Sequence, residues 1–181
     1  MKGAFVIETY NGVSKGLHWL IALLAFVLLA MGKLGEVEAD EGNGLFGWHT
    51  ALGLLVLALM VIRAVWRLTH AVPPPPRGIP AWQQRAAALT HGAFYALLML
   101  LPVSGWLLAS VEGDPLDFFG WFAVPWLPVP GGDAAEDAIE EAHEILGNVL
   151  LLLAALHVTA GLKHHFIDRD EVLRRMLPGG R

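Results

Sequence analysis

Residues 142–166 read AHEILGNVLLLLAALHVTAGLKHHF, and this stretch decides the class of the protein. It is apolar and long enough for a helix to cross a bilayer, which takes about 20 residues. Two histidines, His143 and His157, stand fourteen residues apart in it. On one helix they lie roughly 21 Å apart along the axis and point within roughly 40° of each other. An imidazole inside a bilayer is costly without a partner, so both positions are candidates for function.

Three more apolar segments of similar length lie at 17–34, 45–68 and 86–110. Apolar residues make up 55% of the 181-residue chain and charged residues only 16%, and the charges stand between the apolar runs. This composition is typical of an integral membrane protein. The sequence therefore predicts an all-α fold, a membrane four-helix bundle in a single domain over 1–181. The first segment follows a polar lead and precedes no small-x-small cleavage site, so we expect a permanent anchor rather than a signal peptide.

The lysines and arginines predict the orientation, because cytoplasmic loops carry them in excess. They precede the first segment, surround the connection between the second and third, and follow the fourth, whereas only Lys33 lies on the other side. We therefore expect a multi-pass protein of the bacterial inner membrane with both termini in the cytoplasm. The basic residues on the cytoplasmic side are Lys2, Lys15, Arg63, Arg67, Arg77, Arg85, Lys163, Arg169, Arg174, Arg175 and Arg181.

The two loops predicted to lie outside, 35–44 and 111–141, are rich in acid. Their acidic residues are Glu36, Glu38, Asp40, Glu41, Glu112, Asp114, Asp117, Asp133, Glu136, Asp137, Glu140 and Glu141. The longer of these loops also carries Phe118, Phe119, Trp121 and Trp126 among prolines and glycines, which suits a segment at the membrane interface. On the cytoplasmic side, residues 73–76 are all proline, which predicts a stiff extended connection.

Two further histidines can be placed by depth. The first segment enters from the cytoplasm, so His18 lies on the inner side of the membrane. The second segment enters from outside, so His49 lies on the outer side. The fourth segment also enters from outside, which puts His143 near the outer surface and His157 near the inner one. Depth therefore pairs His18 with His157 and His49 with His143.

A small residue follows each of these four histidines by four positions, one turn later on the same helix face. These residues are Ala22, Gly53, Gly147 and Gly161. A flat macrocycle held by an imidazole lies close to its helix and needs that space. The other histidines, His70, His91, His164 and His165, have Pro74, Tyr95, Asp168 and Arg169 at this offset. The pattern predicts two haem groups, each held by two axial histidines.

The absence of cysteine limits the alternatives. It excludes disulfides, thiolate ligation of haem, c-type haem attachment and cysteine-held iron–sulfur clusters, so a redox cofactor needs histidine or methionine. A single histidine in a membrane helix can instead hydrogen-bond to a neighbouring helix, and glycine is common in such helices. Four histidines at paired depths, each with a small neighbour, favour cofactor ligation. No basic cluster suggests a nucleic-acid partner.

Several motifs stand in an order and spacing that resemble the prokaryotic cytochrome b-561 family, small di-haem proteins of the inner membrane that include superoxide oxidase. The resemblance covers most of the chain. The motifs are Leu17-His18-Trp19-Leu20, His49 followed by LLVLALMVIR over 54–63, Leu101-Pro102-Val103-Ser104-Gly105, His143-Glu144, Leu156-His157 and His164-His165-Phe166. The resemblance implies two haem b groups on His18, His49, His143 and His157, and electron transfer between a donor and a membrane quinone, ubiquinone or another.

The acidic outer loops depart from what a superoxide oxidase needs, because a small anion is steered by positive potential. A dozen acids and one lysine lie in or beside these loops. We expect this surface to repel superoxide and to attract a cationic redox protein, such as a basic soluble cytochrome. Superoxide and a cationic redox protein are both retained as candidate partners on the outer side, with membrane lipid around the bundle.

Four other side chains carry further hypotheses. Arg63 is suited to a propionate of the inner haem, or acts as a positive anchor at the membrane surface. His91 begins the third segment, where an imidazole can exchange protons with a quinone or cap a helix end by a hydrogen bond. His164 and His165 stand where the fourth helix leaves the membrane. A quinone contact and a solvated surface position are the two interpretations of this pair.

Two other functions fit parts of the pattern. A haem-bearing membrane anchor subunit of a dehydrogenase or hydrogenase would share the ligands. A divalent-metal transporter would also place histidines in helices, but it usually needs carboxylate, asparagine or cysteine companions, and the segments contain almost none beyond Asn148 and Glu144. The sequence favours a di-haem b-type cytochrome that transfers electrons between a donor and a quinone, and it does not fix the direction.

Overall fold

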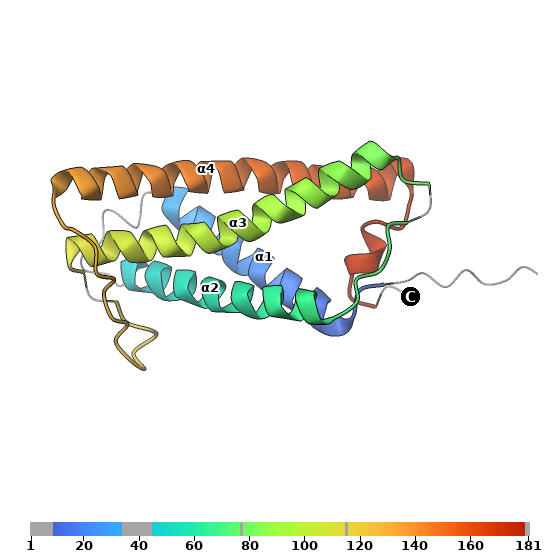
Figure 1. The fold of residues 1–181 in the computed structure, drawn as a ribbon. Helices are drawn as coiled ribbons and strands as arrows, with labels where there is room; N and C mark the ends of the chain where they lie inside the picture. The colour runs from blue at the N-terminus through green and yellow to red at the C-terminus, as the bar shows by residue number, and fades with distance from the viewer. Residues whose placement is uncertain (1–8, 34–44, 77, 115, 180–181) are drawn as a thin grey trace, which may run out of the picture.

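Four long helices make up the protein, which is described for residues 9–33, 45–76, 78–114 and 116–179 in a computed structural model. They are α1 (Gly12–Lys33), α2 (Leu45–Thr69), α3 (Ala81–Glu112) and α4 (Asp133–Lys163), shown in Figure 1. All four are long and apolar enough to cross a membrane. The predicted all-α membrane four-helix bundle is confirmed, while the orientation of the termini stays a prediction.

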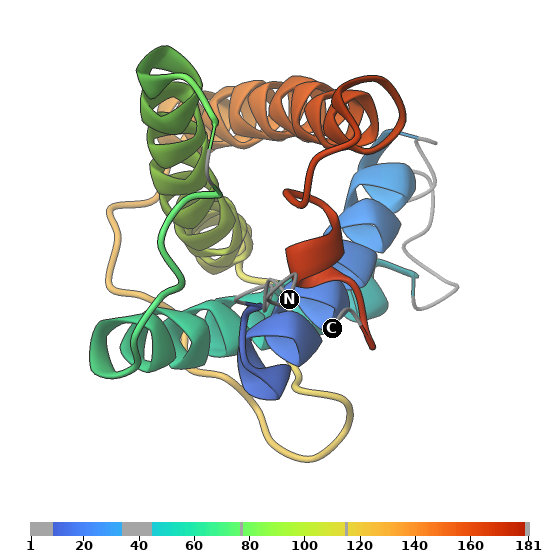
Figure 2. The ribbon, with the colours of Figure 1, turned by 90° about the vertical axis from the view of Figure 1, so that its right-hand side faces the viewer.

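The helices form a ring rather than a bundle packed about one apolar centre. Helix α1 packs against α2, α2 against α3, and α3 against α4, whereas α1 and α4 are not among the closely packed pairs. Figure 2, which looks at one end of the bundle, shows this order around the ring. The buried apolar cluster of Ile21, Val56 and Met60 lies between α1 and α2.

Many large apolar side chains point out of the bundle. Leu23, Leu89 and Leu152 are 62%, 76% and 63% exposed. In water such side chains would be costly, but lipid tails are as apolar as leucine, so no apolar core is needed to drive the helices together. The exposed side chains therefore fit a membrane surround.

The helices are longer than the apolar segments at 17–34, 45–68, 86–110 and 142–166. Helix α3 begins at Ala81, directly after Pro80, and ends before Gly113, whose φ of 75° stops the helix. Helix α4 begins at Asp133 rather than at residue 142. Its first turn carries acidic side chains, which interact favourably with the positive end of a helix dipole. The polar turns at residues 81–85 and 133–141 are helical too, because they contain no proline or glycine to break the helix.

The two ends of the ring differ in charge. We call the end where α1 begins and α4 ends the basic end, and the opposite end, where α3 ends and α4 begins, the acidic end. The described cations of the basic end are Lys15, Arg63, Arg67, Arg85, Lys163, Arg169, Arg174 and Arg175, and the described acids of the acidic end are Glu112, Asp114, Asp117, Asp133, Glu136, Asp137, Glu140, Glu141 and Glu144. The predicted basic positions 2, 77 and 181 and the loop 35–44 lie outside the described residues.

The segment after α4 ties the basic end together. It contains a π-helical turn, η1 (His164–Asp168), and a short 3₁₀ turn, η2 (Arg174–Met176), and Figure 1 shows it returning to the start of α1. The indole N–H of Trp19 donates to the Met176 carbonyl oxygen at 2.9 Å. The buried Arg175 side chain donates to the Pro74 carbonyl oxygen at 2.7 Å. These contacts join α1 to the segment after α4, and that segment to the proline-rich connection.

A long connection between α3 and α4 folds over the acidic end. Its Trp126 indole donates to the Asp114 carbonyl oxygen at 2.8 Å, and its Leu127 N–H donates to the Ser110 hydroxyl oxygen at 3.0 Å. The Trp106 indole on α3 donates to the Pro125 carbonyl oxygen at 3.0 Å. Trp121 is 79% exposed, and the placement of this connection at the membrane interface stays a prediction.

The orientation can be tested with single cysteines, since the chain has none of its own. Gly12 at the basic end and Gly131 at the acidic end both have open space for a side chain. In spheroplasts, a membrane-impermeant maleimide is expected to label Gly131→Cys and to label Gly12→Cys only after lysis. Labelling of Gly12→Cys in intact spheroplasts would overturn the predicted orientation.

Candidate functional site

Two pairs of histidine rings face each other inside the ring of helices. The rings of His18 on α1 and His157 on α4 have centroids 6.4 Å apart and an interplanar angle of 77°. The rings of His49 on α2 and His143 on α4 have centroids 6.3 Å apart and an interplanar angle of 67°. The structure thus brings together the histidines that depth matched in the sequence. Their role as metal ligands stays a prediction.

Both pairs join helices that do not pack closely against each other. The packed neighbours are α1 with α2, α2 with α3, and α3 with α4, so α4 is separated from both α1 and α2. The four rings therefore meet across the interior, not at a helix–helix contact. Such an arrangement suits a group inserted between the two imidazoles of each pair.

The side chains present fit a haem at each pair. Two imidazoles that bind one metal from opposite sides, at the usual metal–nitrogen distances, have ring centres about 6 Å apart. The Nδ1 atom of His49 is buried and has no hydrogen-bond partner among the described residues. Nothing lies within 4 Å of a β-carbon added at Gly53, Gly147 or Gly161, so these three glycines leave the predicted space.

His157 has a second imidazole neighbour. The ring of His91 on α3 lies 5.9 Å from that of His157, and Phe94 lies 5.2 Å from it. Distance alone does not separate His91 from His18 as a partner of His157. However, α3 packs directly against α4, so His91 and His157 meet as residues on neighbouring helices, and Tyr95 stands one turn after His91.

Arg63 lies beside the His18–His157 pair. Its Nε–H donates to the Tyr95 hydroxyl oxygen at 3.3 Å, and its guanidinium carbon lies 5.9 Å from the centre of the Tyr95 ring. Its charge is close enough to act on both His18 and His91. A half-buried guanidinium at this place is positioned to meet an anionic group in the bundle interior.

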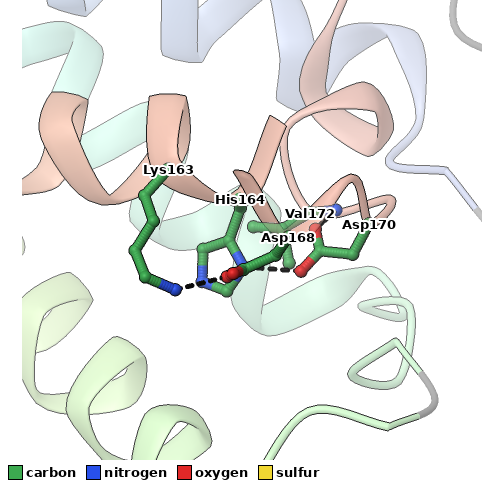
Figure 3. A network of polar contacts seen from close by, with 5 residues as sticks. All are labelled: Lys163, His164, Asp168, Asp170 and Val172. Carbon is green, nitrogen blue, oxygen red and sulfur yellow. Dashed lines mark hydrogen bonds and ion pairs between the residues drawn. The ribbon is translucent and has the colours of Figure 1, made fainter. Parts of the chain in front are cut away.

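His164 belongs to a compact polar network, drawn in Figure 3. Its Nδ1 lies 2.5 Å from Oδ2 of Asp170 and 3.3 Å from Oδ2 of Asp168, and Lys163 Nζ lies 2.5 Å from the same Asp168 oxygen. The side chain of His164 is 15% exposed, so the interpretation of a solvated surface residue is wrong for His164. The possible metal-ligand atoms of His164, Asp168 and Asp170 lie within 4.8 Å of one another, but the Lys163 ammonium group already pairs with Asp168.

The sequence did not single out Asp170, because its contact depends on the π-helical turn and on Arg169, which adopts a φ of 55°. Neighbouring His165 has a buried Nδ1 without a hydrogen-bond partner in the described residues, and its ring packs on Phe166. His70 stacks on Trp66 with ring centroids 3.6 Å apart, away from both pairs.

Ser104 and Gly105 on α3 contact His143, which sequence reasoning also missed. The Ser104 hydroxyl oxygen lies 2.9 Å from Nδ1 of His143. A β-carbon at Gly105 would lie only 3.2 Å from Cε1 of His143. Both residues stand in the motif at 101–105, but that pattern alone does not show which helix face meets His143.

Residues 9–179 match the family described as prokaryotic cytochrome b561. This match covers both histidine pairs and all four helices. The chain belongs to the prokaryotic cytochrome b561 family. It is therefore a multi-pass protein of the bacterial inner membrane, and membrane electron transfer with haem b is the family function.

Three relatives are similar along nearly the whole chain. Cytochrome b561 homolog 2 of Escherichia coli (strain K12) is 34% identical over 94% of this chain and 92% of the relative. Cytochrome b561 homolog 1 of the same organism is 32% identical over 90% of this chain and 93% of the relative. The probable superoxide oxidase CybB of Yersinia pestis is 29% identical over 94% of this chain and 97% of the relative.

Gly105→Ala tests whether the cytochrome b561 chain needs the close approach of α3 to His143. The added carbon would crowd the ring, and overpacking of this kind costs about 1–3 kcal/mol. We expect weaker haem retention at the His49–His143 pair, measured by haem content after detergent washing. Gly92→Ala on the same helix is the control, since nothing lies within 4 Å of its added carbon. Equal haem content in both variants would contradict the expectation.

Proposed function

We propose that this chain holds two haem b groups, one at the His18–His157 pair and one at the His49–His143 pair, and transfers electrons between a donor and a membrane quinone. The observation that carries the proposal is that the two histidines of each pair face each other inside the bundle. Each pair has one member on α4, and these two members stand at different positions along that helix. Membership of the cytochrome b561 family supports the haem type.

The four histidines would each supply one axial ligand, and haem supplies the one-electron chemistry. With two histidines holding each haem, no position at the iron would be left for oxygen, so the haem would supply electron transfer rather than oxygen chemistry. His143 and His157 lie on the uninterrupted helix α4, which fixes the two sites relative to each other. The chain's own part is thus to bind, orient and separate two redox sites across the membrane.

Arg63 would bind a propionate of the haem at the His18–His157 pair. The Tyr95 hydroxyl accepts from its Nε–H, which leaves the two terminal nitrogens of the guanidinium for a carboxylate. A guanidinium suits carboxylates because it can donate two parallel hydrogen bonds. A positive charge beside the haem would also help to balance the charge of the propionates.

Quinone would meet the chain at the basic end, with His91, His164 and His165 as its candidate contacts. His91 lies against the ring of His157, and His164 is hydrogen-bonded to Asp170. Quinone reduction consumes protons and quinol oxidation produces them, and imidazole is a common proton carrier in proteins. His165 carries a buried nitrogen with no partner in the described part of the chain.

The partner at the acidic end would be a cationic redox protein or superoxide. Among residues 9–33, 45–76, 78–114 and 116–179, Lys33 is the only cation at that end, against nine acids. The charge favours the cationic protein, whereas the name of the Yersinia pestis relative favours superoxide. A role as haem-bearing anchor of a larger dehydrogenase or hydrogenase would be seen if the purified chain exchanged electrons with quinone only after a partner was added.

Haem quantitation on single variants tests the ligands. We expect two low-spin b haems per chain in the unchanged protein and about one in His18→Ala, His49→Ala, His143→Ala and His157→Ala. His70→Ala and His91→Ala are the controls and should keep two. Loss of a haem in His91→Ala with retention in His18→Ala would make His91 the partner of His157. A colourless protein that binds divalent metal would instead favour the transporter.

Ionic strength tests the outer partner. We expect haem reduction by superoxide to speed up, and reduction by a basic cytochrome to slow down, as salt screens the acidic end, by roughly tenfold between 10 and 200 mM salt. Charge removal in Glu140→Gln/Glu141→Gln should reduce both dependences, and Glu171→Gln at the basic end is the matched control. Superoxide reduction that is fastest at low salt would contradict electrostatic repulsion.

A further inference from the structure

Ser104 has a buried hydroxyl group that hydrogen-bonds to one of the four histidines, His143. It lies on α3, which contributes none of the four proposed ligands, and is 9% exposed. Its hydroxyl oxygen lies 2.8 Å from the Leu101 carbonyl oxygen and 2.9 Å from Nδ1 of His143. The residue therefore stands between a backbone acceptor and an imidazole.

The two contacts assign the proton between Ser104 and His143. A hydroxyl has one proton to donate, and the Leu101 carbonyl oxygen can only accept, so the Ser104 O–H points to Leu101. The hydroxyl oxygen then accepts from Nδ1–H of His143. Nε2 of His143 is left with the free lone pair.

We propose that Ser104 is a positioning residue that fixes His143 as an Nε2 ligand and makes its imidazole a stronger electron donor to iron. The proposal rests on the proposed haem ligation by His143. A hydrogen bond accepted from the distal N–H orients a metal-bound imidazole and raises its basicity. A more basic ligand stabilises ferric over ferrous iron, so Ser104 lowers the midpoint potential of the haem at the His49–His143 pair.

The other three proposed ligands lack this support. His49 Nδ1 is buried without a partner, and the rings of His18 and His157 make contacts with aromatic rings but no hydrogen bond within the described chain. Gly105, next to Ser104, lets α3 approach the same ring closely. Helix α3 thus supplies a hydroxyl that hydrogen-bonds to a proposed ligand at one haem site, whereas at the other site it supplies the rings of His91 and Phe94.

Redox titration of Ser104 variants in the full holoprotein tests the proposal. Ser104→Ala is expected to keep two haems while the potential of only one rises, by about 59 mV if the ferric-to-ferrous equilibrium shifts tenfold. Its low-spin electron paramagnetic resonance signal should shift as well. Ser104→Thr keeps the hydroxyl and should retain the original potential. Ser110→Ala is the control on the same helix, since its hydroxyl bonds to the Trp106 carbonyl oxygen and the Leu127 N–H and not to a histidine, and it should leave both potentials unchanged.

Unchanged potentials in Ser104→Ala, or equal shifts of both haems, would overturn the proposal. If Ser104→Ala lost one haem, Ser104→Thr would decide. Two haems at the original potentials in Ser104→Thr would support the role of the hydroxyl, and loss of the haem in this variant as well would overturn it, because a retained hydroxyl would then not preserve the site. Failure of the haem ligation itself would be seen separately, as the absence of two b haems in the unchanged protein or their retention in His143→Ala.

Discussion

An imidazole in the interior of a bilayer needs a partner for its nitrogens, and this constraint organises the whole bundle. Two of the rings stand on α4, and their counterparts come from α1 and α2, helices that α4 does not otherwise contact closely. The helices consequently form a ring around the paired histidines. The apolar side chains turn outward, because lipid and not a packed centre surrounds them.

The sequence predicted those parts of the fold that follow from a regular pattern of apolar residues along the chain. Hydropathy located four helices, and the alternation of their directions matched His18 with His157 and His49 with His143 by depth. Contacts that depend on how one helix is rotated against another were not predictable, and Ser104 beside His143, thirty-nine positions away, is the clearest case. Local irregularity was equally hidden, since the π-helical turn that brings Asp170 to His164 leaves no pattern in the residues.

Charge distinguishes the basic end of the molecule from the acidic end. The basic end is closed by hydrogen bonds between the segment after α4, the start of α1 and the proline-rich connection. The acidic end is covered by the connection between α3 and α4, with tryptophan side chains bonded to backbone oxygens. The proposed quinone and the proposed water-dissolved partner would thus meet different ends of the molecule.

The position of both partner histidines on one uninterrupted helix makes the spacing between residues 143 and 157 a fixed register. One inserted residue between them would turn one ring by about 100° relative to the other, so both sites could not keep their counterparts at once. The connection at residues 113–132 holds none of the four histidines, so a change in its length would not alter this register. Homologues of this chain should therefore vary in the length of this connection, while the fourteen-residue interval between His143 and His157 stays constant.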